Sequence, residues 1–244
     1  MNKHFVTKKT LLHFTKLFLR AILFLIILGL YLHDRKRLYE YTVTSPKNGF
    51  NFMHFMWLLF MTLMTLHIFP PRIMTMGVRK AKKKSYIPVE EYSEEALLKY
   101  VQEKNKRAWT AMLAWFALNA IVAALYFSGI IGKPELLLIT GFYFLSDYVC
   151  ILIFCPFQTF AMKSRCCVNC RIYDWGHFFM FTPMLFMNTF YGWTLFFMGT
   201  AVIVHWEVAF TRHPERFWDG SNKALKCVNC KDKTCLVKRK TTKL

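Results

Sequence analysis

The chain alternates between long apolar blocks and short polar turns, and the blocks approach the length that a helix needs to cross a bilayer. Blocks of this length separated by basic turns are typical of a chain surrounded by lipid, and not of a domain that folds around its own core. We therefore predict an all-α fold, a polytopic membrane protein with a six-helix transmembrane bundle. The six blocks lie at residues 17–32, 50–69, 109–127, 136–154, 178–190 and 193–210.

The fifth block is the shortest, and Pro183 and the polar break at 188–192 allow two interpretations of the last two blocks. They form either a tight hairpin of two helices or one long bent helix. With six spans and the amino terminus inside, 28 of the 33 Lys and Arg residues lie on the inner side, whereas five spans would place ten of them outside. The positive-inside rule therefore favours the hairpin, with both termini in the cytoplasm.

Composition agrees with a membrane protein, since 55% of the residues are hydrophobic and 18% are aromatic. The net charge of +19 is explained by topology and by attraction to anionic lipid, so we predict the bilayer as a partner and exclude nucleic acid. Four basic residues precede the first block, a fifth, Arg20, lies in its first turn, and no small-residue cleavage site follows it, which predicts an uncleaved anchor. We expect an integral protein of a bacterial cytoplasmic membrane.

We predict one membrane domain, 1–244, with polar segments on the cytoplasmic side. The segment 70–107 is first basic and then acidic, and Ser93 followed by Glu94 and Glu95 predicts the start of a short amphipathic helix that leads into the third span. The loop 156–176 and the tail 211–244 are rich in cysteine. Because the outer loops are short, we expect the chemistry in the membrane or at the inner face.

The tetrapeptide CVNC occurs twice, at 167–170 and 227–230, on either side of the predicted hairpin. A helix that leaves and one that returns bring both copies to the same membrane surface. The inner side is normally reducing, so clustered thiols there bind metal or carry out redox chemistry more readily than they form structural disulfides. Two C-x-x-C turns supply four thiolates for zinc or iron. The predicted ligands are Cys167, Cys170, Cys227 and Cys230, with Cys166 or Cys235 as alternatives.

Three functions follow from this prediction. In the leading hypothesis the cysteines hold iron or an iron–sulfur centre, which passes electrons from a cytoplasmic donor, such as an acidic soluble carrier, to a membrane acceptor such as a quinone. In the second, a zinc ion is structural, and the bundle serves as a scaffold or transporter subunit. In the third, one C-x-x-C pair carries out thiol–disulfide exchange without a metal.

The two motifs resemble the paired C-x-x-C knuckles of rubredoxins and zinc ribbons, but Arg171 and Lys231 stand where those families usually have glycine. The adjacent cations should stabilise thiolate charge. In addition, RCCVNCRIYDW, HPERF and the terminal C-x2-C-x4-C pattern resemble a set of uncharacterised bacterial multi-span membrane proteins over the last 90 or so residues. This resemblance implies no activity.

Other polar residues near the predicted spans are candidates for function. Asp147 lies well inside the fourth block, where a carboxylate costs about 2.5–3.5 kcal/mol on insertion scales, so it should face the bundle and find a partner. His205 and Glu207 at the inner end of the sixth block can act as ligands, as partners of the thiolates or as a proton route, or can simply reach the interface. His54 and His67 are 13 residues apart and suit two stacked haems only if each finds a second histidine.

Overall fold

The structure, a computed structural model, describes residues 8–35, 38, 39, 52–164, 166–230, 232, 233, 235 and 238. Within these ranges the fold is all-helical, as the hydrophobic pattern predicts, and contains no β-strand. Four helices are long and apolar enough to cross a membrane: α1 (Lys8–His33), α5 (Glu94–Phe127), α6 (Lys133–Leu152) and α8 (Phe190–Arg212). A fifth apolar helix, α3 (Phe52–Ile68), has 17 residues and is close to the shortest that can span a bilayer.

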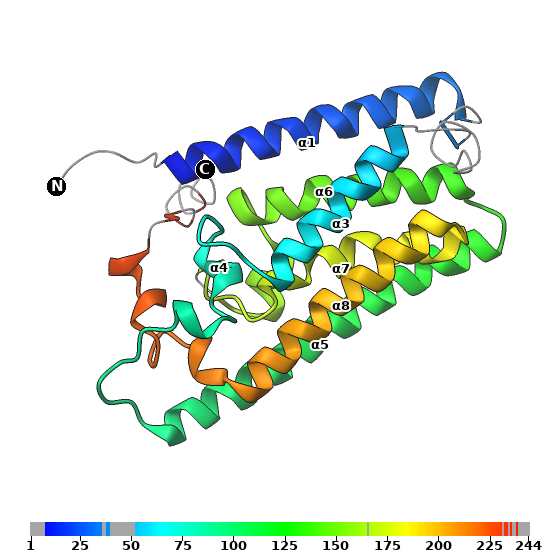
Figure 1. Cartoon of the computed structure of the whole chain (residues 1–244). Helices are drawn as coiled ribbons and strands as arrows, with labels where there is room; N and C mark the ends of the chain where they lie inside the picture. The colour runs from blue at the N-terminus through cyan, green and yellow to red at the C-terminus, as the bar shows by residue number, and fades with distance from the viewer. Residues whose placement is uncertain are drawn as a thin grey trace.

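The long helices run side by side, with α1 and α5 in one direction and α3, α6 and α8 in the other (Figure 1). α1 packs mainly against α6, and α3 packs against α8. One end of the bundle contains the starts of α1 and α5 and the ends of α3, α6 and α8. We call it the cysteine end, because the described cysteines lie in the last turn of α6 or in the connecting segments at this end. The predicted loop and tail therefore do come to the same end of the helices.

The fifth block differs from the continuous helix that hydropathy predicts. It forms the short helix α7 (Gly176–Phe181) and then the 3₁₀ helix η5 (Thr182–Met187), which has Pro183 in its first turn. Asn188 adopts a left-handed conformation with φ of 52°, and the chain then turns back into α8. Both α7 and η5 pack against α6 and α8, so the last two blocks form a hairpin whose first arm is enclosed by the bundle.

α5 combines two predicted elements into one helix of 34 residues. Ser93 caps it as the sequence indicates, since the Ala96 backbone amide donates to the Ser93 hydroxyl at 3.3 Å. The amphipathic segment after Ser93 then continues into the third apolar block without a break. At the other predicted boundary, α8 ends at Arg212, directly before His213 and Pro214.

The connecting segments at the cysteine end consist of short helical turns. An isolated antiparallel bridge between Pro88 and Asn222 joins the first of these segments to the tail. The turns are α4 (Met76–Arg79), η2 (Lys83–Ser85), the π-helical η3 (Phe157–Ala161), η4 (Tyr173–Trp175), η6 (Pro214–Arg216), η7 (Lys223–Leu225) and η8 (Cys227–Asn229).

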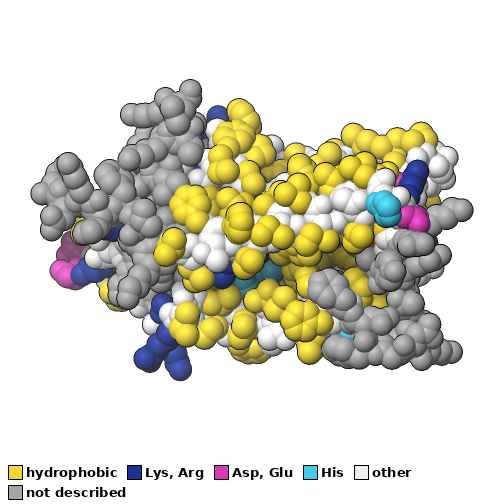
Figure 2. Space-filling view, turned by 90° about the horizontal axis from the view of Figure 1, so that it is seen from above, with side chains coloured by type: hydrophobic (Ala, Val, Ile, Leu, Met, Phe, Trp, Pro, Cys, Tyr) yellow, Lys and Arg dark blue, Asp and Glu magenta, His cyan; other side chains and the backbone are white. Residues whose placement is uncertain are grey.

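The outer surface of the bundle is apolar. Phe18, Leu25 and Leu32 of α1 are all exposed, and little of this helix is buried against the rest of the chain. Figure 2 shows apolar side chains across the middle of the face seen from above, with most of its charged side chains towards the two ends. An apolar surface of this extent is stable against lipid but costly in water, which agrees with an integral membrane protein.

Candidate functional site

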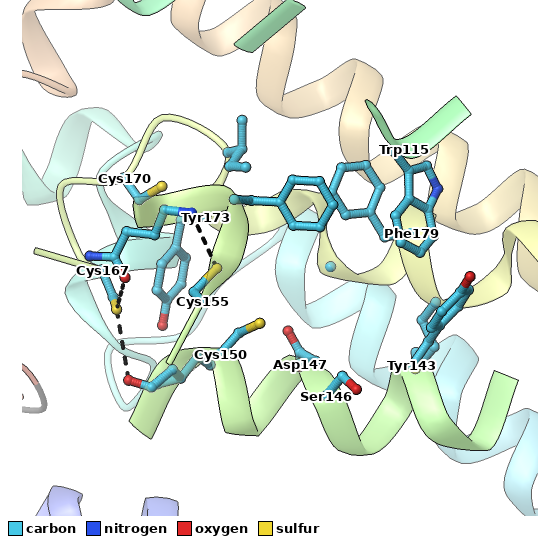
Figure 3. A pocket seen from close by; sticks show the side chains of 16 residues that line it. Trp115, Tyr143, Ser146, Asp147, Cys150, Cys155, Cys167, Cys170, Tyr173 and Phe179 are labelled. Carbon is cyan, nitrogen blue, oxygen red and sulfur yellow. Dashed lines mark hydrogen bonds between the residues drawn. The ribbon is translucent and has the colours of Figure 1, made fainter. Parts of the chain in front are cut away.

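A cavity of about 130 Å³ lies at the cysteine end, between α5, α6, α7 and the segments that follow α6. Four of its lining residues are cysteines and one is a carboxylate, while aromatic side chains form much of the remaining wall. In Figure 3 the sulfur atoms gather at one end of the cavity, Trp115 and Phe179 lie at the other, and Asp147 lies between them. The four cysteines are Cys150, Cys155, Cys167 and Cys170.

The end of α6 supplies one pair of thiols. Cys150 lies in its last turn, and the chain leaves the helix after Leu152, so that Cys155 folds back beside Cys150 before Pro156 starts the next turn. The Cys150 and Cys155 side chains are neighbours that influence each other's charge, and the Cys155 sulfur accepts from the Gln158 backbone amide at 3.3 Å. Neighbouring thiols can form an S–S bond when their Cβ atoms come within about 4.5 Å.

The first CVNC turn, residues 167–170, supplies the other pair. The Cys170 backbone amide donates to the Cys167 carbonyl at 3.0 Å, which closes the turn with both thiols buried. Cys167 Sγ donates to Gln158 Oε1 at 3.2 Å. Behind the turn, the buried Lys80 Nζ donates to the carbonyls of Val168 and Cys170 at 2.6 and 2.8 Å. Burial lowers the pKa of Lys80 to about 7, and its two hydrogen bonds fix the turn.

The second CVNC turn has the same local form but different surroundings. Its Cys230 amide donates to the Cys227 carbonyl at 3.3 Å, yet Cys227 is exposed, and neither cysteine lines the cavity. Cys230 and Cys235 lie close enough to Cys166 to influence its charge. Across the described residues, no three or more His, Cys, Asp or Glu side chains are arranged to hold a metal ion. The four predicted ligands are therefore not gathered into one group, and the metal centre stays a prediction.

The thiols of the cavity differ in acidity. The hydrogen bond from Cys150, opposed by burial and aided by the Gln158 amide, lowers the pKa of Cys155 to about 7. Burial raises the pKa of Cys167 and that of Cys170 to about 11. A thiolate is a far better nucleophile than a thiol, so at neutral pH Cys155 is the reactive member of the set.

Alkylation should reveal this difference directly. During short iodoacetamide pulses in mild detergent, we expect the labelling rate of Cys155 to rise as the pH passes about 7, and the rates of Cys167 and Cys170 to rise only towards pH 11. At pH 7 Cys155 should react on the order of 100-fold faster, after allowance for the lower intrinsic nucleophilicity of an acidic thiolate. Peptide mass spectrometry measures each rate, and equal rates for the three would contradict this assignment.

Lys238 of the basic tail lies at the sulfur end of the cavity. Its Nζ donates to the Cys150 carbonyl at 2.7 Å, to Gln158 Oε1, and to Cys167 Sγ at 3.5 Å. A cation at this position stabilises negative charge on the neighbouring sulfurs.

Asp147 finds its partner on α1. Arg20 Nη1 donates to Asp147 Oδ2 at 2.8 Å and to the Phe144 carbonyl at 2.7 Å, and its guanidinium lies 4.0 and 4.1 Å from the ring centroids of Phe144 and Tyr148. The prediction that this carboxylate faces the bundle is correct. The ion pair between Arg20 and Asp147 joins α1 to α6 beside the cavity, and Asp147 itself lines the cavity.

Glu207 takes part in a buried ion pair beside the first CVNC turn. Its carboxylate accepts hydrogen bonds from both terminal nitrogens of Arg171, and it accepts a third from the Trp175 indole N–H at 2.9 Å. The Arg171 guanidinium also lies 3.6 Å from the ring centroid of Phe210. Arg171 is thus engaged in an ion pair with Glu207.

The remaining histidine candidates also have protein partners. His205 Nε2 lies 3.2 Å from Lys82 Nζ, and His54 Nε2 lies 2.9 Å from the Tyr191 hydroxyl. His67 bonds Asp174 through Nδ1, and its ring meets that of His177 edge to face, with centroids 4.5 Å apart. The three candidates, His54, His67 and His205, do not line the cavity.

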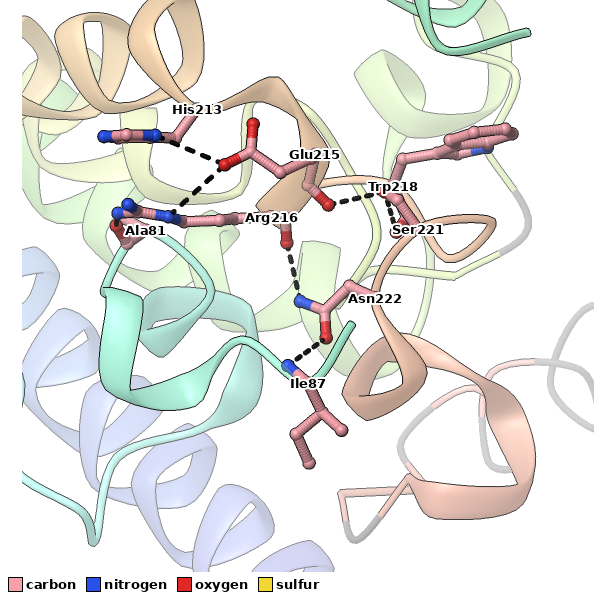
Figure 4. Close-up of polar contacts among 8 residues, drawn as sticks. All are labelled: Ala81, Ile87, His213, Glu215, Arg216, Trp218, Ser221 and Asn222. Atoms are coloured by element: carbon pink, nitrogen blue, oxygen red, sulfur yellow. Dashed lines mark hydrogen bonds and ion pairs between the residues drawn. The ribbon is translucent and has the colours of Figure 1, made fainter. Parts of the chain in front are cut away.

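The HPERF motif ties the tail to the segment after α4 (Figure 4). Glu215 contacts His213 and Arg216, and Arg216 Nη1 donates to the Ala81 carbonyl at 3.1 Å. Asn222 completes the link by donating to the Arg216 carbonyl and accepting from the Ile87 amide. These contacts make the motif structural, since they hold two connecting segments together.

The site predicted from the sequence does not include Cys150 and Cys155. A usable signal was present, because Tyr143, Asp147 and Cys150 are spaced four and three residues apart and so share one face of a helix. That face lines the cavity. The partners from distant segments, Arg20 and Lys238, carry no comparable signal in the sequence.

Comparisons with protein-family models, curated proteins and solved structures find no match for the chain. Its function therefore has to be inferred from its own residues.

Proposed function

We propose that the protein is a membrane redox protein whose working group is the Cys150–Cys155 thiol pair in the cysteine-lined cavity. One observation carries the proposal: four thiols from two segments line one cavity, and Cys150 and Cys155 are neighbours in it. Structural thiols rarely need such a cavity, whereas a redox pair needs space for its reaction partner.

The chemistry is a two-electron reaction. Oxidation of Cys150 and Cys155 breaks two S–H bonds, forms one S–S bond and releases two electrons and two protons. Reduction of that disulfide can come from the pair Cys167 and Cys170 across the cavity, because exchange between a dithiol and a disulfide moves two electrons without a net change in protons. A cytoplasmic donor then reduces the pair Cys167 and Cys170. An acidic donor would be attracted by the basic cysteine end.

The proposed setting is a bacterial cytoplasmic membrane with the cysteine end on the cytoplasmic side. The excess of Lys and Arg at this end supports the orientation by the positive-inside rule. The chain would cross six times, with α3 as the second segment and the enclosed arm of α7 and η5 as the fifth. The long apolar surfaces of α1 and α5 support contact with lipid acyl chains.

A second candidate function keeps a metal in the same place. Four thiols line one cavity, which equals the number of ligands that iron or zinc takes in tetrahedral sites, but they are not arranged there to hold a metal ion. A thiolate-held iron, iron–sulfur or zinc centre made by Cys150 and Cys155 with Cys167 and Cys170 would therefore require these side chains to move together. In this set Cys150 and Cys155 take the places that the sequence prediction gave to Cys227 and Cys230. Iron would again carry electrons, whereas zinc would be structural.

Metal content and thiol count separate the two candidates. We expect protein purified anaerobically in mild detergent to contain no stoichiometric iron or zinc, and its eight titratable thiols to fall to six after brief treatment with diamide. Elemental analysis and a thiol assay measure both quantities. Stoichiometric iron with a visible band that dithionite bleaches, and thiols that do not titrate until the metal is removed, would contradict the thiol-pair proposal and support the metal centre.

A further inference from the structure

The cavity is divided into two chemically different parts. Its sulfur end is formed by the four cysteines, and its opposite end is formed by flat aromatic side chains (Figure 3). A cavity of similar size, about 150 Å³, holds one benzene molecule in an engineered protein, so 130 Å³ suits a single six-membered ring.

The aromatic end is preorganised for a planar ring. Trp115 and Phe179 stack with centroids 4.5 Å apart and an interplanar angle of 19°, and Tyr143 lies 4.7 Å from Trp115. Thr182 fixes the indole by accepting its N–H at 3.2 Å. Flat apolar faces held in this way favour an aromatic or quinonoid ring, which gains from stacking as well as from burial.

Asp147 brings an acid–base group to the space between the two ends. Arg20 binds its Oδ2, while its Oδ1 lies against Gly176. A Cβ on Gly176 would be 2.8 Å from Oδ1, so glycine leaves room for the carboxylate at this position. Because Asp147 lines the cavity, its carboxylate lies where it can exchange a proton with a bound molecule.

The size of the cavity limits the redox cofactors that it can hold. Nicotinamide and flavin nucleotides are several times larger than one six-membered ring, and a single ring already occupies a volume of about 130 Å³. The described lining residues include no Lys or Arg, and Lys238, which reaches the sulfur end, is hydrogen-bonded to lining residues there. A lipid-soluble ring without phosphate, able to accept two electrons, fits the aromatic end.

We infer that the cavity binds the ring of a quinone, which accepts two electrons from Cys150 and Cys155 while Asp147 transfers a proton. The inference rests on the proposed thiol-pair function and names its acceptor. In the complete reaction the two S–H bonds break, one S–S bond forms, and the quinone gains two O–H bonds as it becomes a quinol. Cys150 supplies one of the two protons from its S–H group. The other comes from solvent, which received the proton that Cys155 released on becoming a thiolate, and it reaches the quinone through Asp147.

The test uses full-length, reduced protein in nanodiscs made from synthetic lipid without quinone, with decylubiquinone as the probe. We expect saturable quenching of tryptophan fluorescence, and one quinone reduced for every two thiols lost under anaerobic conditions. Ser146→Leu, which fills the cavity beside Asp147, should abolish the quenching and the quinone reaction but still form a disulfide with diamide. Asp147→Asn should keep the quenching and lower the reduction rate by about 10²-fold or more.

Phe142→Leu is the matched control, because this exposed side chain of α6 does not line the cavity. It should bind and reduce decylubiquinone at the rate of the unmodified protein. Unsaturable quenching that Ser146→Leu leaves unchanged would overturn the quinone site and indicate that the cavity holds lipid or detergent. If diamide still forms the disulfide in that case, the thiol-pair function stands alone; if it forms none, both proposals fall.

Discussion

Replacing Cys155 by serine is expected to abolish oxidation of the thiol pair. Cys155 is the most acidic thiol of the cavity, and its sulfur is the one that Cys150 and the Gln158 amide already contact. Serine keeps the size and a hydrogen-bonding oxygen but cannot form an S–S bond. Diamide should then consume no thiols in the cavity at neutral pH, and quinone reduction should fall by at least about 10²-fold, as is usual when a covalent nucleophile is removed.

Cys227→Ser is the matched control for this variant. Cys227 has the same side chain but is exposed and lies outside the cavity, so the substitution should leave both reactions intact. The comparison is informative in either direction. If Cys227→Ser removes the redox activity and Cys155→Ser does not, the site is formed by the two CVNC turns, and the cavity is not the centre of the chemistry.

Replacing Glu207 by glutamine is expected to give the largest loss of stability. Arg171 is 1% exposed and donates to both carboxylate oxygens of Glu207, which also accept the Trp175 indole N–H. The variant leaves a buried guanidinium without a counter-charge. Breaking a fully buried pair costs about 3–5 kcal/mol, and because Glu207 is 40% exposed we expect the free energy of unfolding to fall by about 2–3 kcal/mol.

Glu103→Gln provides the reference for an ordinary surface pair. Glu103 contacts Arg107 one turn along α5 and is 55% exposed, so its loss should cost no more than about 0.5 kcal/mol. Tryptophan fluorescence during unfolding by SDS in mixed micelles measures both variants under the same conditions. Equal stability of the two would mean that Arg171 is solvated and does not depend on Glu207.

Because Arg171 follows Cys170 directly, Glu207→Gln should also loosen the first CVNC turn and raise the accessibility of its thiols.

The helices could be predicted because hydropathy reports burial in an apolar environment. For α1, α5, α6 and α8 that environment includes the exterior of the bundle, so their blocks correspond to membrane-length helices. The fifth block was equally apolar, but it is buried against α6 and α8. Hydropathy cannot distinguish lipid from protein neighbours. It also carries no information on backbone conformation, and so it does not predict the short 3₁₀ segment that begins beside Pro183.

The candidate site was predicted only in part, for a geometric reason. Connectivity correctly indicated that the cysteine-rich loop and tail meet at one end of the bundle. It could not indicate which way each thiol points. Cys166 and Cys167 are adjacent, yet Cys167 lines the cavity while Cys166 lies near the sulfurs of Cys230 and Cys235. The structural partners of the cavity, Lys80 and Lys238, are separated from it by long stretches of sequence.

Identification of the residue joined to Cys155 in the oxidised protein tests the central claim most directly. The protein in nanodiscs would be equilibrated over a series of thiol redox buffers, quenched with acid, alkylated and digested for mass spectrometry. We predict one two-electron transition, in which Cys150 and Cys155 become joined to each other in the same molecule. An oxidised protein in which Cys155 remains free, with the cross-link between other cysteines or none at all, would contradict the account.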